Sequence, residues 1–186
     1  MCKWLRDDYV ILITFLQFEF QRRVYDTYMI DSLPKLEINK YIKTKCKISW
    51  VQKSLEIYLH RIADLNDLES LSESLNSHYQ NPKDRLTDRL ASNPGPIEGH
   101  VCIGQWSRDL CFYRILCLGN GQVQFIDFGN FSQLGIESHY EESNKDFVFI
   151  ENLFYLPEKF AKLAPFAIRY DVITQLRNKS LPITIT

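Results

Sequence analysis

The sequence predicts a mostly β fold with helices, of the α+β class. Three observations support this: short apolar runs between tight turns over residues 100–134, a pair of β-rich runs within residues 47–59, and an amphipathic stretch at about 66–80. The chain has 186 residues, of which 45% are hydrophobic and 13% are aromatic. A chain of this length and composition can form a proper hydrophobic core.

The charge balance and the cysteines restrict the class of protein. The 22 basic and 23 acidic residues leave a net charge of −1, which argues against a general phosphate-backbone binder. The five cysteines follow no CxxC spacing, so we expect buried thiols in a reducing compartment, with no cofactor and no metal. The alternative is a zinc site built from His100, Cys102 and another thiol.

Residues 1–40 form an N-terminal segment that matches no recognisable pattern. The apolar run from Tyr9 to Phe20 is shorter than the ~20 residues of a membrane span and contains Gln17 and Glu19. No small-residue cleavage site follows, so neither a membrane span nor a signal peptide is predicted. Apolar residues four apart favour a helix here, with a strand as the alternative. We expect a soluble, intracellular chain.

A strand pair and a helix are predicted before the main internal boundary. Lys47 to Leu59 contains two β-rich runs around a polar break, which is typical of a hairpin or a bulged strand. Asn66 is the expected N-cap of the helix at 66–80, whose inner face would carry Leu68, Leu71, Leu75 and Tyr79. The prolines and glycine at 94–96 place the boundary near residue 97.

Short strands dominate the chain after that boundary. Tight turns join them, the clearest being Gly119-Asn120-Gly121, and such strands form a small closed or nearly closed barrel. The expected strands are His100–Trp106, Cys111–Leu118, Gln122–Phe128 and a fourth that starts with Phe131–Leu134. Leu156 to Arg169 predicts a short helical turn and a packing segment, interrupted by Pro165.

Four stretches, CIGQW, CFYRI, VQFIDFGN and LPEKFAKLAPFA, resemble the signature of the extended Tudor domain. The resemblance covers residues 98–168. It implies an SH3-like Tudor barrel at 98–140, joined to a split staphylococcal-nuclease-like half of the OB type. That half would take its first part, with the linker helix, from 41–97, and its second part, with a loop, from 141–186. Leu181 to Thr186 would return to complete it.

The same resemblance implies a binding site for a methylated arginine. Carried over residue by residue, an aromatic cage would consist of Trp106, Tyr113, Phe125 and Phe128, with Asn130 at its rim. Phe replaces the commoner Tyr at 125 and 128, and Trp replaces Phe at 106, but a cage depends on π faces and not on hydroxyls. The alternative is that these rings only fill a small barrel.

A dimethylated guanidinium suits such a cage because it keeps its charge and loses hydrogen-bond donors. Asn130 can accept one of its remaining N–H groups. The resemblance implies symmetric dimethylarginine in the Arg-rich tails of Piwi-family partners. The chain would then be an adaptor of the piRNA pathway, in the cytoplasm at perinuclear germ granules. The spacing of the cage residues in the sequence does not distinguish a symmetrically from an asymmetrically methylated arginine, or a methyl-arginine from a methyl-lysine.

An acidic stretch supports a cationic partner. Between Gly135 and Glu151 lie several acids against a single Lys145, and they would attract an arginine-rich peptide if they lie near the cage. The acids are Glu137, Glu141, Glu142, Asp146 and Glu151. The alternative is a solvated acidic loop.

Catalysis is not predicted. The sequence has no GxSxG, HExxH or P-loop pattern, and its four histidines are scattered. Asp127 is expected to bond backbone at its turn. Two other functions stay open. One is a scaffold that binds an unmodified protein partner and leaves the cage unused. The other is an OB-type nucleic-acid module, which the neutral charge disfavours.

Overall fold

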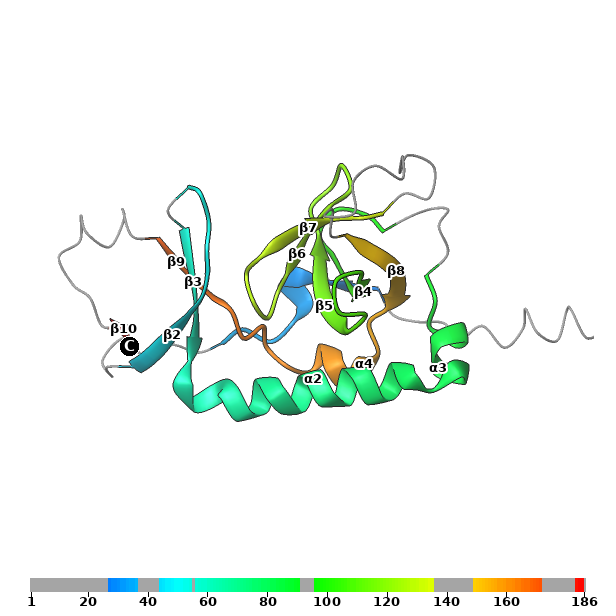
Figure 1. Ribbon diagram of the computed structural model, residues 1–186, viewed down its shortest axis with the longest axis horizontal. Coiled ribbons are helices and arrows are strands. Elements are labelled where there is room, and N and C mark those ends of the chain that lie inside the picture. Colours follow the sequence, from blue (N-terminus) through cyan, green and yellow to red (C-terminus); the bar gives the residue numbers. More distant parts are fainter. Residues whose placement is uncertain are drawn as a thin grey trace, which may run out of the picture.

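A computed structural model describes residues 27–36, 44–54, 56–90, 96–135, 149–171 and 183–185. Two sheets lie side by side above one long helix, α2 (Leu65–Gln80). The helix starts beneath the smaller sheet and then runs along the larger one (Figure 1). The fold is mostly β with a few helices, as the sequence predicts.

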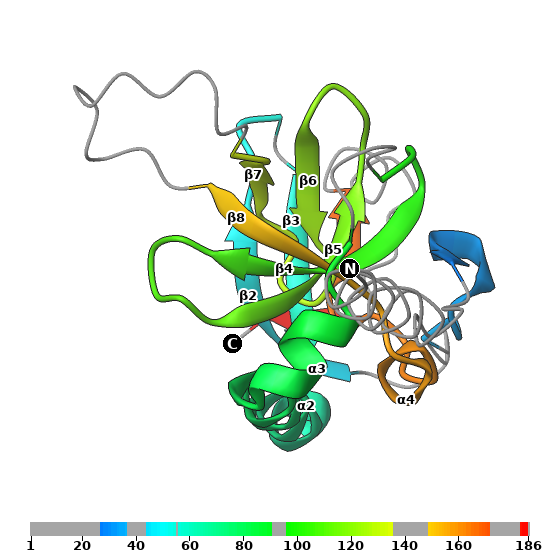
Figure 2. The same ribbon diagram turned by 90° about the vertical axis from the view of Figure 1, so that its right-hand side faces the viewer.

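The larger sheet forms the barrel. Its strands follow the order β1-β4-β5-β6-β7, and β8 pairs antiparallel with β4. An isolated bridge between Leu134 and Ile150 brings the chain after β7 to β8, which closes the sheet into the barrel seen in Figure 2. The strands are β1 (Tyr28–Met29), β4 (His100–Trp106), β5 (Phe112–Cys117), β6 (Gln122–Phe125), β7 (Phe131–Gln133) and β8 (Ile150–Tyr155).

Two strands of this barrel have no counterpart in the prediction. β1 lies within the unassigned segment 1–40, and β8 lies after residue 140. The hairpin between β5 and β6 forms where it was expected, and all three residues of its Gly119-Asn120-Gly121 turn have positive φ angles.

The smaller sheet has the order β10-β2-β3-β9. β2 and β3 form the predicted hairpin, and β2 also carries a bulge between Ile48 and Trp50, so both expected features occur together. β10 lies within the predicted final strand and pairs parallel with β2. The strands are β2 (Thr44–Val51), β3 (Glu56–Arg61), β9 (Ile168–Asp171) and β10 (Ile183–Ile185).

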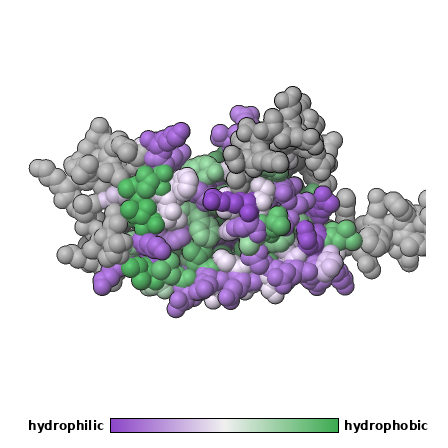
Figure 3. Space-filling view, in the orientation of Figure 1, coloured by the Kyte–Doolittle hydropathy of each residue, from purple (hydrophilic) through white to green (hydrophobic). Residues whose placement is uncertain are grey.

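Helix α2 buries the four predicted residues Leu68, Leu71, Leu75 and Tyr79. Its opposite face is hydrophilic (Figure 3). The predicted cap is wrong, because the N-cap position belongs to Asp64 and not to Asn66. The Asp64 carboxylate makes no capping bond and instead accepts a hydrogen bond from Arg61 Nε at 2.5 Å. Shorter helices are α3 (Pro82–Thr87) and α4 (Glu158–Ala161), and 3₁₀ turns are η1 (Ile30–Ser32) and η2 (Ile62–Asp64).

Three apolar clusters form the described core. The largest lies between α2 and the barrel, where Tyr79 stacks on Phe112 with ring centroids 4.8 Å apart. The second fills the barrel and includes Cys102, Cys117 and Phe125. The third, in the smaller sheet, consists of Cys46, Leu59 and Tyr170.

The buried thiols of Cys46, Cys102 and Cys117 fit the expectation from the cysteine pattern. Hydrogen bonding to Cys117 and burial raise the pKa of the Cys102 thiol, which disfavours the thiolate that zinc binds. Within the described ranges, no group of three or more His, Cys, Asp or Glu side chains could hold a metal ion. The zinc alternative therefore has no support in the described part of the chain.

Two sequence-based expectations lie outside the described residues: the apolar run from Tyr9 to Phe20 and most of the acidic stretch, residues 136–148. Of the helices that are described, none is both long and apolar enough to cross a membrane.

Candidate functional site: an aromatic cage

The turn after β6 decides where the two phenylalanines of FIDFGN point. β6 ends at Phe125, and the N–H groups of Phe128 and Gly129 both donate to the Phe125 carbonyl, at 3.2 and 2.7 Å. Gly129 has a φ of +88°, and a Cβ there would collide with the Tyr58 ring. The predicted strand to residue 128 is therefore wrong over its last three residues. Because Phe128 lies in this turn and not in the strand, its side chain does not follow the alternation of faces along β6.

All four predicted rings meet at this end of the barrel. The Tyr113 ring centroid lies 5.2 Å from that of Phe125 and 5.7 Å from that of Phe128. Trp106 lies 5.5 Å from Phe125 and 6.1 Å from Tyr113. The interplanar angles of these pairs run from 69° to 85°, so neighbouring rings stand nearly perpendicular. The four rings therefore pack edge to face, which is a preferred geometry of aromatic pairs.

The rings differ in exposure. Phe125 is only 1% exposed and packs among Ile115, Val123 and Ile150, so it lies behind the other rings as a floor. Trp106, Tyr113 and Phe128 are half-buried, so part of each side chain is accessible. Asn130 is also half-buried. Its backbone carbonyl accepts a hydrogen bond from the Phe125 N–H at 2.9 Å, which places Asn130 beside Phe125.

The turn between β4 and β5 adds charged groups that sequence reasoning did not assign to the site. Asp109 accepts a 2.7 Å hydrogen bond from the Tyr113 hydroxyl, and the Cys111 N–H donates to its other carboxylate oxygen at 2.9 Å. The Arg108 guanidinium lies 5.7 Å from the Trp106 ring. Burial and, next, the Asp109 carboxylate hold the pKa of Tyr113 well above its ordinary value, so this phenol stays neutral. The polar turn at 108–109 was the only sequence signal.

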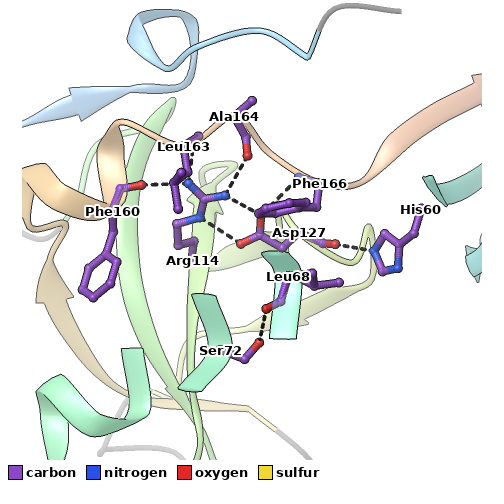
Figure 4. Close-up of polar contacts among 9 residues, drawn as sticks. All are labelled: His60, Leu68, Ser72, Arg114, Asp127, Phe160, Leu163, Ala164 and Phe166. Carbon is purple, nitrogen blue, oxygen red and sulfur yellow. Dashed lines mark hydrogen bonds and ion pairs between the residues drawn. The ribbon is translucent and has the colours of Figure 1, made fainter. Parts of the chain in front are cut away.

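A buried ion pair joins β5 to the turn after β6 (Figure 4). Arg114 on β5 donates from Nε and Nη2 to the two Asp127 oxygens, at 2.9 and 2.5 Å. The same guanidinium donates to three backbone carbonyls after α4 begins, those of Phe160, Leu163 and Ala164. Both side chains are almost fully buried. The pair ties the cage turn to the 160–166 segment through charge-assisted hydrogen bonds.

Asp127 therefore plays a different part from the expected one. Its carboxylate accepts from Arg114 and from the backbone N–H of Phe166, at 3.2 Å, and not from backbone of its own turn. The sequence signal for this pair was an arginine placed in an otherwise apolar strand, CFYRI. A buried acid with these partners is a structural group that orients the turn.

Four aromatic rings thus meet at the end of a small closed barrel, next to a second sheet. The family model of the Tudor domain matches residues 38–151, more than half of the chain. The chain therefore belongs to the Tudor domain family, whose members are binding modules. No curated protein matches the chain by sequence.

Several solved structures share the fold. The extended Tudor domain TD3 of mouse TDRD1, in complex with a MILI peptide containing dimethylarginine, aligns at a TM-score of 0.55 and 20% identity, over 74% of this chain and 63% of that one. The human TDRD1 extended Tudor domain in complex with a symmetrically dimethylated peptide aligns at 0.51 and 21%, over 76% and 64%.

The extended Tudor domain of Drosophila melanogaster Tudor-SN aligns at a TM-score of 0.50 and 22% identity, over 67% of this chain and 51% of that one. The match thus spans between half and two thirds of the length of these solved chains. Together they confirm the predicted extended Tudor fold, a barrel joined to a nuclease-like half.

Proposed function

We propose that the aromatic cage binds a dimethylated arginine of a partner protein and that the chain acts as a non-catalytic adaptor. The observation that carries this proposal is the meeting of Trp106, Tyr113 and Phe128 above a Phe125 floor, with neighbouring rings nearly perpendicular. Each cation–π contact contributes about 0.5–2 kcal/mol, depending on desolvation.

The groups around the rings suit a guanidinium. Asp109, held by Tyr113 and the Cys111 N–H, brings a carboxylate beside the walls. Asn130 has a side-chain oxygen that can accept a remaining N–H. Methylation removes donors and adds apolar surface, so the modified side chain loses less hydration on entering than unmodified arginine does.

The partner we propose is an arginine-rich tail carrying symmetric dimethylarginine, of the kind found in Piwi-family proteins. Two TDRD1 domains with the same fold were solved with dimethylated peptides, one of them from MILI. Such a partner would place the chain in the cytoplasm, at germ granules of the piRNA pathway. The partner class and location rest on this likeness and on the cage.

Titration with matched peptides tests the proposal. One arginine-rich peptide would be prepared unmethylated, symmetrically dimethylated and asymmetrically dimethylated, and its binding measured by calorimetry. We expect the symmetric form to bind most tightly, and Phe128→Ala to weaken that binding about two- to thirtyfold. Phe131→Ala is the matched control, because Phe131 contacts Tyr58 and lies outside the ring set of the cage. Equal affinity for all three peptides would contradict the proposal.

A second candidate is a scaffold that binds an unmodified protein. It is favoured by exposed apolar side chains on β2, where Ile48, Trp50 and Val51 are 41 to 51% exposed. Figure 3 shows hydrophobic side chains gathered over the smaller sheet. For this function, Trp50→Ala would abolish partner binding while Phe128→Ala would leave it unchanged.

A further inference from the structure

Two side chains of the smaller sheet form hydrogen bonds to the backbone carbonyls of Asp127 and Phe128, one on each side of the Phe128 Cα. His60 on β3 donates from Nε2 to the Asp127 carbonyl at 2.6 Å, as Figure 4 shows. Because a carbonyl only accepts, Nε2 carries the proton. Ser49 on β2 donates to the Phe128 carbonyl at 2.5 Å. Two side chains of one hairpin therefore hold consecutive peptide groups of the cage turn.

Ring contacts from the same hairpin cover the turn. The His60 ring meets the Phe128 ring edge-on, with centroids 5.7 Å apart and an interplanar angle of 73°. Tyr58 packs against Gly129, leaving no room for a Cβ there. His60 and Tyr58 are 7% and 5% exposed. Phe128 thus lies between Tyr113 of the barrel and His60 of the smaller sheet.

The four rings of the cage differ in what orients them. Trp106, Tyr113 and Phe125 lie on β4, β5 and β6, whose ladders fix their backbones. Phe128 lies in the turn beyond β6, so no strand pairing orients it. Its backbone N–H bonds to the Phe125 carbonyl, its ring contacts Tyr113, and the Arg114 ion pair holds the neighbouring Asp127 side chain. The hairpin adds its contacts to the carbonyls of Asp127 and Phe128 and to the Phe128 ring.

We propose that the β2–β3 hairpin positions the Phe128 wall of the cage, with His60 and Ser49 as positioning residues that act through the carbonyls of Asp127 and Phe128. The nuclease-like half then contributes to recognition without touching the methylated side chain. The binding consequence rests on the proposed function. The orientation of Phe128 does not, since it is a property of the protein alone.

Binding measurements form the first test. His60→Leu removes the donor, and we expect it to weaken binding of the symmetrically dimethylated peptide about two- to tenfold, the effect of losing one hydrogen bond. His60→Gln keeps an N–H donor and should recover part of the loss. His100→Leu is the matched control, because His100 begins β4 and Trp106 ends it, so the two lie at different ends of the strand. Ser49→Ala tests the second contact, with Ser49→Thr retaining the hydroxyl, and stands in for His60→Leu if that variant does not fold.

A double-mutant cycle separates positioning from general destabilisation. In a Phe128→Ala background, His60→Leu should cause no further loss of affinity, because the wall that it orients is gone. Equal losses in both backgrounds would overturn the proposal. So would a loss of stability in His60→Leu without any change in affinity.

A measurement without peptide keeps the two proposals distinguishable. In the wild-type protein, NMR should show a nuclear Overhauser effect between the Phe128 and Tyr113 rings, whose centroids lie 5.7 Å apart. His60→Leu and Ser49→Ala should weaken it, and His100→Leu should not. If no methylated peptide binds, the proposed function fails, and this signal still decides whether the hairpin positions Phe128. An unchanged signal in both hairpin variants overturns the positioning role.

Discussion

The barrel and the smaller sheet differ in how much core each possesses. The barrel is supported by two apolar clusters, one inside it and one against α2. Among the described residues, the smaller sheet has one cluster, formed by Cys46, Leu59 and Tyr170. Its other buried side chains, Tyr58 and His60, are covered by the cage turn.

From the described residues, we expect the barrel to be the more stable unit and the smaller sheet to be stabilised by its contact with the barrel. Burial of apolar area is the dominant favourable term in folding, so a three-residue cluster contributes little by itself. The cage lies where the two units meet, between rings fixed by the barrel and a ring held by the sheet.

The largest expected effect comes from breaking the ion pair inside the barrel unit. Arg114→Ala would leave the Asp127 carboxylate buried without its partner, and three carbonyls would lose their donor. We expect a loss of about 3–5 kcal/mol in the free energy of unfolding, measured by urea denaturation. Arg169→Ala is the control, since the Arg169 side chain is 63% exposed in its pair with Glu56, and it should cost at most ~1 kcal/mol. Similar losses in the two variants would show that the buried ion pair stabilises the fold no more than the exposed one does.

The two phenylalanines of the cage turn should separate stability from binding. Phe125→Ala removes a ring that is 1% exposed, and it should cost about 3–5 kcal/mol of unfolding free energy. Phe128 is half-buried, so Phe128→Ala should cost less, about 1–2 kcal/mol, because part of its surface already faces water. Thermal and chemical denaturation of both variants give the comparison. A larger loss for Phe128 than for Phe125 would make Phe128 a core residue and end its assignment as a wall.

Matched core truncations compare the two units directly. Ile103 in the barrel and Leu59 in the smaller sheet are both 0% exposed. Ile103→Ala should lower the unfolding free energy by about 3–5 kcal/mol, and Leu59→Ala by about 2 kcal/mol, since fewer neighbours lose contacts around Leu59. Hydrogen exchange should show opening confined to β2 and β3 in Leu59→Ala, with the barrel amides still protected. Uniform loss of protection would mean that the two units unfold together.

The smallest expected effect lies at a barrel turn. Leu110 has a φ of +60° and is 58% exposed. Leu110→Gly relieves the left-handed strain at the cost of greater freedom in the unfolded chain, so we expect a gain of at most ~1 kcal/mol in the free energy of unfolding. The midpoint of thermal unfolding measures it. A clear loss of stability would show that the Leu110 side chain contributes packing that outweighs the strain.

Local sequence patterns were sufficient to predict those helices, strands and turns whose conformation depends on residues close together in the chain. The apolar spacing of α2 follows from side-chain periodicity, which a single segment carries by itself. The limits of β4 follow from a short run that ends before the polar turn at 108–109. The Gly119-Asn120-Gly121 hairpin follows from residues that tolerate positive φ. The resemblance to the extended Tudor domain, and not strand geometry, supplied the set of four rings, and the ring contacts bring these four together.

Tertiary structure alone decided the rest. The backbone partners of Arg114 and Asp127 lie 46 to 50 and 39 residues away along the chain, and no local pattern specifies such a distant bond. In the turn after β6, Gly129 packs against Tyr58 of the other sheet, a contact between residues 71 apart in the sequence that no local pattern specifies. For the same reason the sequence could name Phe125 and Phe128 together but could not tell floor from wall. Burial is a property of what packs against a residue, and that packing comes from both sheets.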